Sequence, residues 1–228
     1  MNDFWHLETE DFFEGLQDEK NVFLTLASRH LLKRQDTVFL EGEAGAACFY
    51  IESGLVRIFS SSLTGKEMTL FLRRKGEVFG LAELMDHTSR KASAQALTPS
   101  VIYTIGRPAF ERLLQKYFSL TKRVISLLGK RLRYMGKRLS SQNGDVRHRL
   151  AFSLISLAYD RLQKSPNWEQ PCRLPHPISQ HQLAAMVGST QPTVSSVLQD
   201  FKNENLIDTA GHTITLLSPM KFIYLLNT

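Results

Sequence analysis

Cysteine is scarce in this chain of 228 residues, since only Cys48 and Cys172 are present. They form no Cys-x-x-Cys pair, which leaves no disulfide framework and no set of four thiolates for a structural zinc or an iron–sulfur cluster. Apolar runs are short as well: none approaches the length of about 18 residues that a membrane span needs, and the opening segment lacks the basic and apolar regions of a secretory signal. We therefore expect a cytoplasmic protein.

Catalytic motifs are also missing. The sequence contains no P-loop, no Gly-x-Ser-x-Gly elbow and no His/Glu spacing typical of a metal site. The seven histidines are scattered, and His87, in a polar stretch, is better explained as solvated than as a ligand. Cys48 lies in an apolar run and is expected in the core, whereas Cys172 lies in a proline-rich stretch nearer the surface. We therefore predict a protein that is not an enzyme and that holds no metal, haem or iron–sulfur cluster.

The composition, 43% hydrophobic and 22% charged, is that of a globular protein, and the length predicts two modest domains. The net charge of +6 is uneven. Residues 1–107 hold 12 basic and 15 acidic residues, whereas residues 108–228 hold 16 and 7. Nine basic residues and no acidic ones lie between Arg112 and Gly144. This favours a polyanionic partner, with a solvated basic helix face as the alternative.

The first half has the texture of a β-sheet with regular corners. Glycine is suited to such corners because it reaches positive φ without steric cost. The corner glycines are Gly42, Gly54, Gly65 and Gly76, and runs rich in β-branched or aromatic residues lie at 38–40, 48–51, 55–59, 68–72 and 101–105. Before Thr37, the spacing of Val22, Leu24, Leu26, Leu31 and Leu32 predicts a short helix. We expect an all-β roll preceded by this helix.

The segment 78–85 interrupts the strand pattern. A helical turn after Gly80 would direct free backbone N–H groups at the site opposite Arg90, and together these groups would form an anion pocket. The alternative is that Phe79 and Leu84 fill the roll while Arg90 lies in solvent. The candidate effector-binding residues, two of them from the following long helix, are Phe79, Gly80, Leu81, Glu83, Arg90, Lys91, Arg131 and Arg133.

A long helix follows Pro108. Apolar residues recur every three or four positions from Phe110 to Leu139, which predicts about eight helical turns with a narrow apolar seam. Such a helix fits a coiled-coil dimer, with an ordinary core helix as the alternative. Gly129 and Gly136 lower helix propensity and are therefore expected at a close approach of a partner helix or ligand. The predicted hinge is Asn143, Gly144 and Asp145, with Asp145 as the N-cap of the next helix.

The last third carries a helix-turn-helix pattern. Ser179 and Gln182 have capping-box spacing, Gly188 begins a tight turn, and Thr190 and Pro192 open a second helix. Residues 206–216 alternate around Gly211, as in a β-hairpin or wing. Hydroxyl and amide side chains are suited to reading base edges, and an αα-hairpin with a solvated polar face is the alternative. The candidate DNA-binding residues are Ser179, Gln180, Ser189, Thr190, Gln191, Thr193, Ser195, Ser196 and Gln199.

This order of parts resembles the bacterial Crp-Fnr superfamily of transcription regulators over nearly the whole chain. The resemblance is carried by Gly42-Glu43 and by residues 49–54, 76–80 and 178–207. It implies an α+β fold: a cyclic-nucleotide-binding-like β-roll (jelly-roll) over residues 1–107, a dimerisation helix over 108–142 and a winged helix-turn-helix over 143–228. It further implies a homodimer in which a small-molecule effector repositions the helix-turn-helix on palindromic double-stranded DNA, with RNA polymerase as a further partner of an activator.

Departures from the family pattern narrow the range of possible effectors. The cyclic-nucleotide receptors have Gly-Glu and Arg-Ser pairs around the phosphate, whereas here Leu81 follows Gly80 and Lys91 follows Arg90. Met135 and Gly136 stand where a Thr-Ser pair would contact the purine, so cyclic AMP is disfavoured. The four-cysteine oxygen sensors and the carbon-monoxide-sensing haem proteins are disfavoured too. A small anion remains, and the members that sense 2-oxo acids have a similar Phe-Gly followed by apolar residues.

The recognition helix departs from the family as well. Family members present Arg, Glu and Arg, and the matching positions here are Gln191, Pro192 and Ser196. Because Gln pairs bidentately with adenine whereas Arg prefers guanine, we expect an operator different from the common one. No Lys or Arg precedes Lys202 in this helix, so a ligand-binding regulatory module with weakened DNA binding stays open as an alternative.

Overall fold

A computed structural model describes residues 11–62, 65, 67–141, 145–162, 165 and 167–227. The described chain divides into two compact units, one up to Arg131 and one from Leu132 onward. The division therefore falls within the stretch 108–142, which the sequence predicts as a separate segment. None of the helices among the described residues is long and apolar enough to cross a membrane.

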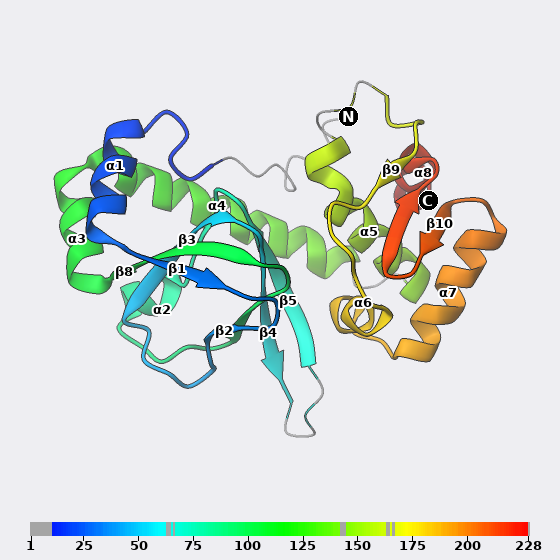
Figure 1. Ribbon diagram of the computed structural model, residues 1–228, viewed down its shortest axis with the longest axis horizontal. Coiled ribbons are helices and arrows are strands. Elements are labelled where there is room, and N and C mark those ends of the chain that lie inside the picture. Colours follow the sequence, from blue (N-terminus) through cyan, green and yellow to red (C-terminus); the bar gives the residue numbers. More distant parts are fainter. Residues whose placement is uncertain are drawn as a thin grey trace. The chain divides into compact units, whose positions relative to one another are not determined.

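The first unit is a β-roll of two antiparallel sheets (Figure 1). One sheet has the strand order β1-β8-β3-β6 and the other β2-β7-β4-β5. The strands are β1 (Ser28–Leu32), β2 (Thr37–Phe39), β3 (Ala47–Ser53), β4 (Leu55–Ser61), β5 (Glu67–Arg74), β6 (Val78–Phe79), β7 (Ser93–Ala96) and β8 (Ser100–Gly106). The helices are α1 (Gln17–Leu26), α2 (Leu81–Asp86), α3 (Arg107–Lys116) and α4 (Phe118–Ser141), the last of which continues beyond Arg131.

The four corner glycines have the positive φ that their spacing predicts. Gly54 shows why no other residue fits, because a Cβ there would lie 2.1 Å from Oγ of Ser100. The prediction of a β-roll is confirmed.

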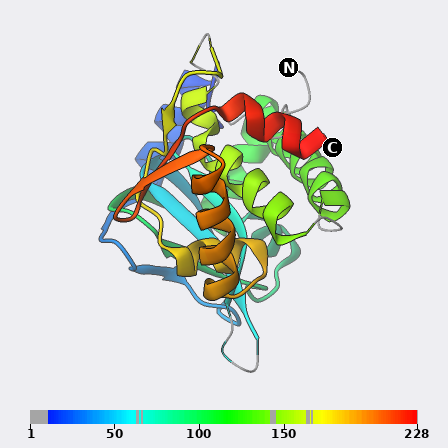
Figure 2. The ribbon, with the colours of Figure 1, turned by 90° about the vertical axis from the view of Figure 1, so that its right-hand side faces the viewer.

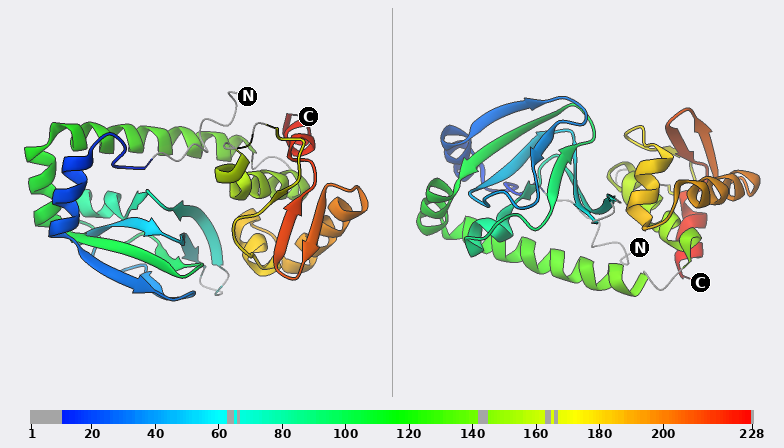
Figure 3. Two further views of the ribbon diagram at one scale, coloured as in Figure 1. Left: turned by 45° about the horizontal axis from the view of Figure 1, so that its top comes forward. Right: turned by 90° about the horizontal axis from the view of Figure 1, so that it is seen from below.

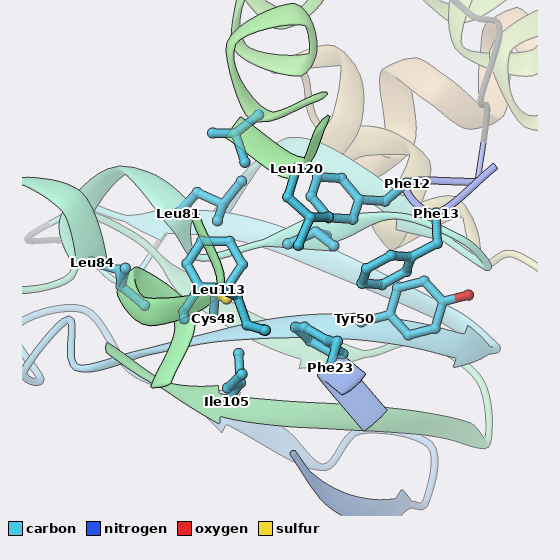
Figure 4. Packing of buried hydrophobic residues seen from close by; sticks show 13 residues of the cluster. Phe12, Phe13, Phe23, Cys48, Tyr50, Leu81, Leu84, Ile105, Leu113 and Leu120 are labelled. Atoms are coloured by element: carbon cyan, nitrogen blue, oxygen red, sulfur yellow. The ribbon is translucent and has the colours of Figure 1, made fainter. Parts of the chain in front are cut away.

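Two apolar clusters hold this unit together. One joins the sheet to the helices and includes Cys48 of β3, Leu113 of α3 and Leu120 of α4 (Figure 4). The other lies within the roll, where the ring of Phe49 stacks on those of Phe39 and Phe79 at centroid distances of 5.4 and 5.0 Å. Cys48 is buried, as predicted, and burial raises the pKa of its thiol well above the usual range.

Two local predictions are wrong. Leu31 and Leu32 belong to β1 rather than to the opening helix, because this segment pairs with residues 100–104 of β8. The long helix is also interrupted: α3 ends at Lys116, and Tyr117 is extended with φ −118° and ψ 95° before α4 begins. From Phe118, α4 runs without interruption to Ser141 (Figure 3).

The second unit contains a three-stranded sheet of order β10-β11-β9 and four helices. Its core includes an edge-on contact between Phe201 and Phe222, with ring centroids 5.3 Å apart. The hairpin β10–β11, which we call the wing, turns at Gly211 as predicted. The elements are α5 (Val146–Leu162), β9 (Cys172–Arg173), α6 (Gln180–Val187), α7 (Gln191–Asn203), β10 (Ile207–Ala210), β11 (Thr213–Leu216) and α8 (Pro219–Asn227).

Candidate effector site and nucleic-acid interface

Gly80 links β6 to α2 in a left-handed conformation, with φ 74°. A Cβ at this position would lie 3.0 Å from Nη1 of Arg90 and 3.2 Å from the ring of Phe49. Glycine is therefore required here for two reasons, its backbone conformation and the close approach of Arg90.

Arg90 is a buried arginine, with only 3% of its surface exposed. Its Nη1 donates to the carbonyl of Gly80 at 3.0 Å, and its Nη2 donates to the carbonyl of Ala47 at 2.5 Å. The carboxylate of Glu83 lies 3.4 Å from Nη1. The structure therefore brings Gly80, Glu83 and Arg90 together. The alternative interpretation is correct that Phe79 and Leu84 are buried but wrong that Arg90 is solvated.

The electrostatics of Arg90 follow from this burial. Desolvation lowers its pKa, and the carboxylate of Glu83 acts in the opposite direction. The guanidinium carbon lies 4.3 Å from the ring centroid of Phe39, a cation–π contact. Nε is buried without a hydrogen-bond partner in the described part of the chain. An anion entering here therefore meets a guanidinium whose Nη groups already bond to the chain's own oxygen atoms.

Arg131 forms a second, largely buried cluster, in which its side chain is 19% exposed and joins α4 to β6. Its guanidinium donates to the carbonyl of Val78 and lies 4.0 Å from the carboxylate of Glu77. Arg73 contacts the same carboxylate oxygen at 3.2 Å. Burial, followed by repulsion from Arg73, lowers the pKa of Arg131 to about 9. Arg73 and Glu77 left no signal in the sequence, because no local pattern shows that a β-turn and a distant helix come together.

The other predicted effector residues are distributed differently. Phe79 and Leu81 are buried in the two apolar clusters. The side chains of Lys91 and Arg133 are exposed. Met135 is partly buried, and the space beside Gly136, where a Cβ would lie, is open.

The helix-turn-helix has the predicted caps. The Ser179 hydroxyl accepts from the backbone N–H of Gln182, whose side chain in turn accepts from the N–H of Ser179, which completes a capping box. Gly188 ends α6 in the left-handed conformation with φ 64°. The Thr190 hydroxyl then caps α7 by accepting from the N–H of Thr193. The predicted sequence of helix, turn and helix is confirmed.

The predicted DNA-binding residues lie at the start of α6, in the turn and along α7, and the wing contacts α7 through β10 (Figure 2). The hydroxyls of Thr190 and Thr193 share a hydrogen bond of 2.8 Å, and Gln199 donates to Asn203 at 3.0 Å. The opposite face of α7 buries Val194, Leu198 and Phe201. The exposed members are Gln180, Thr190, Gln191, Thr193, Ser196 and Gln199, and the partly buried ones are Ser179, Ser189 and Ser195.

Charge on α7 is sparse and partly neutralised. Asp200 is exposed, and Lys202 is partly buried. Glu204, which follows the helix, pairs with Arg147 of α5 at 2.5 Å, and the guanidinium of Arg147 lies over the ring of Phe201. This pair raises the pKa of Arg147 and lowers that of Glu204. The side chain of Arg147 is therefore engaged at the C-terminal end of α7.

Of the predicted hinge residues, Asn143 and Gly144 lie outside the described residues. Asp145 caps α5, because its carboxylate accepts from the N–H of His148 at 2.8 Å. The prediction that Asp145 is an N-cap is confirmed.

The first unit is a β-roll with a buried arginine beside its short helix, and the second is a winged helix-turn-helix. This combination defines the class of DNA-binding regulators that carry a ligand-binding domain. Comparison with known proteins agrees. Residues 29–117 match the cyclic nucleotide-binding domain family, and residues 148–223 match the Crp-like helix-turn-helix domain family.

Individual relatives extend the match over most of the chain. The cyclic AMP receptor protein of Thermus thermophilus is 30% identical over 204 residues, which is 89% of this chain and 90% of that protein. A CRP-like cAMP-activated global transcriptional regulator of Mycobacterium tuberculosis is 27% identical over 207 residues, covering 90% and 91%. The structure of FixK2 from Bradyrhizobium japonicum superposes with a TM-score of 0.75 at 18% identity, covering 87% and 96%, and supports the fold.

The chain belongs to the Crp-Fnr family of transcription regulators. It is a DNA-binding regulator with a cyclic-nucleotide-binding-like effector domain, and members of this family are not enzymes.

Proposed function

We propose that the protein is a cytoplasmic, homodimeric regulator whose β-roll binds a small anion and thereby repositions α7 on a palindromic operator. The observation that carries this proposal is the start of α7, where Gln191, Thr193 and Ser196 are exposed on a capped helix that is anchored by a buried face. Exposed amide and hydroxyl groups on a rigid helix are the groups that read base edges in the major groove.

The proposed dimer rests on α4. Phe118, Ile125 and Leu132 recur at heptad spacing and are 72%, 65% and 74% exposed. Leu128, also exposed, supplies the intermediate position. Large apolar side chains in a continuous exposed seam favour pairing with a second helix of the same kind. The open space beside Gly136 would allow close approach of that helix.

The proposed effector is an anion that contacts Arg90, the backbone N–H groups near Gly80 and Leu81, and Arg131 of α4. The named relatives are a receptor for cyclic AMP and a cAMP-activated regulator. This chain has Leu81 and Lys91 where the receptor pattern has Glu and Ser, so we favour a small anion such as a 2-oxo acid over a cyclic nucleotide. Glu83 would be the group that the anion displaces from Arg90.

Gating requires that the effector domain and the DNA-binding domain adopt two arrangements about the hinge before Asp145. The effector must bind one of these arrangements more tightly than the other. RNA polymerase would be a further partner if the protein activates transcription.

Native mass spectrometry of protein purified without added ligand, under anaerobic conditions, tests the dimer and the effector together. We expect a dimer, and any extra bound mass identifies a retained effector. If the dimer is empty, anions and nucleotides are screened for their effect on DNA binding. A ligand response that survives Arg90→Ala would remove Arg90 from the effector site, and a monomer would contradict the role of α4.

A second candidate is a ligand-binding regulatory module whose DNA binding has weakened. It is favoured by one observation: α7 has no Lys or Arg before Lys202, whereas Asp200 is exposed on it. Sequence-selective DNA binding that weakens with salt separates the two candidates. Binding that is absent at low salt would support the second.

A further inference from the structure

The segment that carries α6, α7 and the wing, residues 179–217, has an unusual charge for a DNA-binding surface. It holds one basic residue, Lys202, against Asp200, Glu204 and Asp208, so its net charge is −2 in a chain of net charge +6. DNA affinity depends largely on the neutralisation of phosphates by cationic side chains. Fixed positive charge is therefore missing where the proposed function needs it most.

Several arginines of the second unit are engaged within it. Arg147 pairs with Glu204, Nε of Arg149 donates to the carbonyl of Val187 at 2.9 Å, and Arg161 donates to the carbonyl of Arg173 at 3.0 Å. The cationic groups that remain within the segment 179–217, besides Lys202, are two imidazoles, those of His181 and His212.

The two histidines lie near the first of the predicted DNA-binding residues, Ser179 and Gln180. His181 is an exposed residue of α6, directly after Ser179 and Gln180. His212 is exposed at the tip of the wing, and its carbonyl accepts from the N–H of Ile178 at 2.8 Å. That bond holds the wing tip against the residue that precedes Ser179. Both imidazoles are therefore placed beside the first turn of α6, the helix that crosses the DNA backbone in a helix-turn-helix.

The surroundings leave both imidazoles available. In the described part of the chain, neither side chain makes a hydrogen bond or an ion pair. Around His212, the adjacent elements carry Arg173 on β9, Asp208 on β10 and His176 in the segment before α6. Around His181, α6 packs against α5, which carries Arg147, His148 and Arg149, and against α7, which carries Asp200 and Lys202.

We propose that His181 and His212 contact DNA phosphates in their protonated form, so that DNA binding takes up protons. This inference rests on the proposed DNA-binding function. An imidazole gains its charge between about pH 8 and pH 5. A phosphate that binds only the charged form draws protonation toward higher pH, and by linkage the affinity rises as the pH falls. The protein would then bind its operators more tightly in acid.

The test is fluorescence anisotropy with the full-length protein and a labelled duplex of random sequence, because phosphate contacts do not depend on sequence. For the wild type, we expect the association constant to rise about tenfold or more from about pH 8 to about pH 5.5. The salt dependence should steepen by about 2 in log–log slope for each protomer, and so by about 4 for the dimer, since each phosphate contact contributes about 0.9.

Variants assign the effect to the two side chains. In His181→Gln/His212→Gln, the change with pH should fall below about twofold. In His181→Lys/His212→Lys, affinity near pH 8 should match that of the wild type near pH 5.5 and stay flat, because the charge is fixed. The matched control is His30→Gln, an exposed histidine of β1 in the other unit, which should behave as the wild type.

A steep pH dependence that persists in the double glutamine variant would overturn the inference while leaving DNA binding intact. Absence of binding at every pH, in the wild type and the lysine variant alike, would contradict the proposed DNA-binding function and this inference with it.

Discussion

Arg90 in the β-roll and Gln191 at the start of α7 are both predicted to bind a partner, yet their surroundings differ. Arg90 is 3% exposed and bonds to two carbonyls and a carboxylate of its own chain. Gln191 is exposed and stands on a helix whose other face is buried. Burying a charge is costly unless it is paired, whereas an exposed amide exchanges water for a partner at little cost.

This difference separates two ways of building a binding site. In the roll, the polar groups hold the fold together, so an effector must compete with internal partners such as Glu83. On α7, the fold is held by Val194, Leu198 and Phe201 on the opposite face, so the side chains that are predicted to read DNA are free to change. Substitutions in the roll should therefore affect stability, and substitutions on α7 should affect DNA specificity.

The largest expected effect is that of Arg90→Ala. Removing the guanidinium deletes its hydrogen bonds to the carbonyls of Gly80 and Ala47 and its ion pair with Glu83. The free energy of unfolding should therefore fall by about 3–5 kcal/mol. Urea denaturation measures it, with Lys91→Ala, an exposed neighbour, expected within about 0.5 kcal/mol of the wild type. Equal stability of the two variants would mean that Arg90 does not support the roll.

Next in size is Gln191→Ala, which should act on DNA and not on folding. The free energy of unfolding should stay within about 0.5 kcal/mol of the wild type. Discrimination at one base pair of each half-site should fall by about 1–3 kcal/mol. Binding to a panel of single-base operator variants measures this. A uniform loss across the panel would instead identify Gln191 as a backbone contact.

A smaller effect concerns Arg131, whose pKa burial lowers to about 9. Above that pH the folded chain releases a proton that the unfolded chain keeps, so stability rises with pH. From about pH 8 to about pH 10, the wild type should gain about 1 kcal/mol relative to Arg131→Met. Denaturation of both proteins across this range measures the difference. If the difference in free energy of unfolding between the two proteins stayed constant with pH, Arg131 would keep its proton in the folded chain.

The smallest effect should come from the Arg147–Glu204 pair, which is partly exposed. Arg147→Gln should lower the free energy of unfolding by less than about 1 kcal/mol. Because Arg147 lowers the pKa of Glu204, any contribution of the pair is present at neutral pH and is lost as the pH falls through that lowered value. If Arg147→Gln lowered the free energy of unfolding as much as Arg90→Ala, buried and exposed arginines would not differ in their contribution to stability.

Local signals explain what could be predicted from the sequence. The capping box of Ser179 and Gln182, the turn at Gly188 and the cap at Thr190 depend on residues three or four positions apart, and all are present as expected. Positive φ at the corner glycines is equally local. These features outline the helix-turn-helix and the roll because each needs only its own neighbours in sequence.

The features that could not be predicted from the sequence depend on contacts between distant segments. Leu31 lies in β1 because β8, some 70 residues later, pairs with it. The break at Tyr117 left no signal, since apolar residues continue in helical phase through Leu113, Tyr117 and Leu120. The Arg73–Glu77–Arg131 cluster needs α4 to meet the turn before β6. Burial of Arg90 likewise depends on Ala47 of β3 and on Gly80, which links β6 to α2, since both accept hydrogen bonds from it.

Selection of binding sites from a random DNA pool by the purified protein, followed by sequencing, tests the central claim most directly. The account predicts enrichment of a palindrome whose two half-sites are centred about one helical turn apart, with one position in each half-site that relaxes in Gln191→Ala. No enrichment at low salt, or enrichment of a single unrepeated site, would contradict a dimeric regulator that reads DNA through α7.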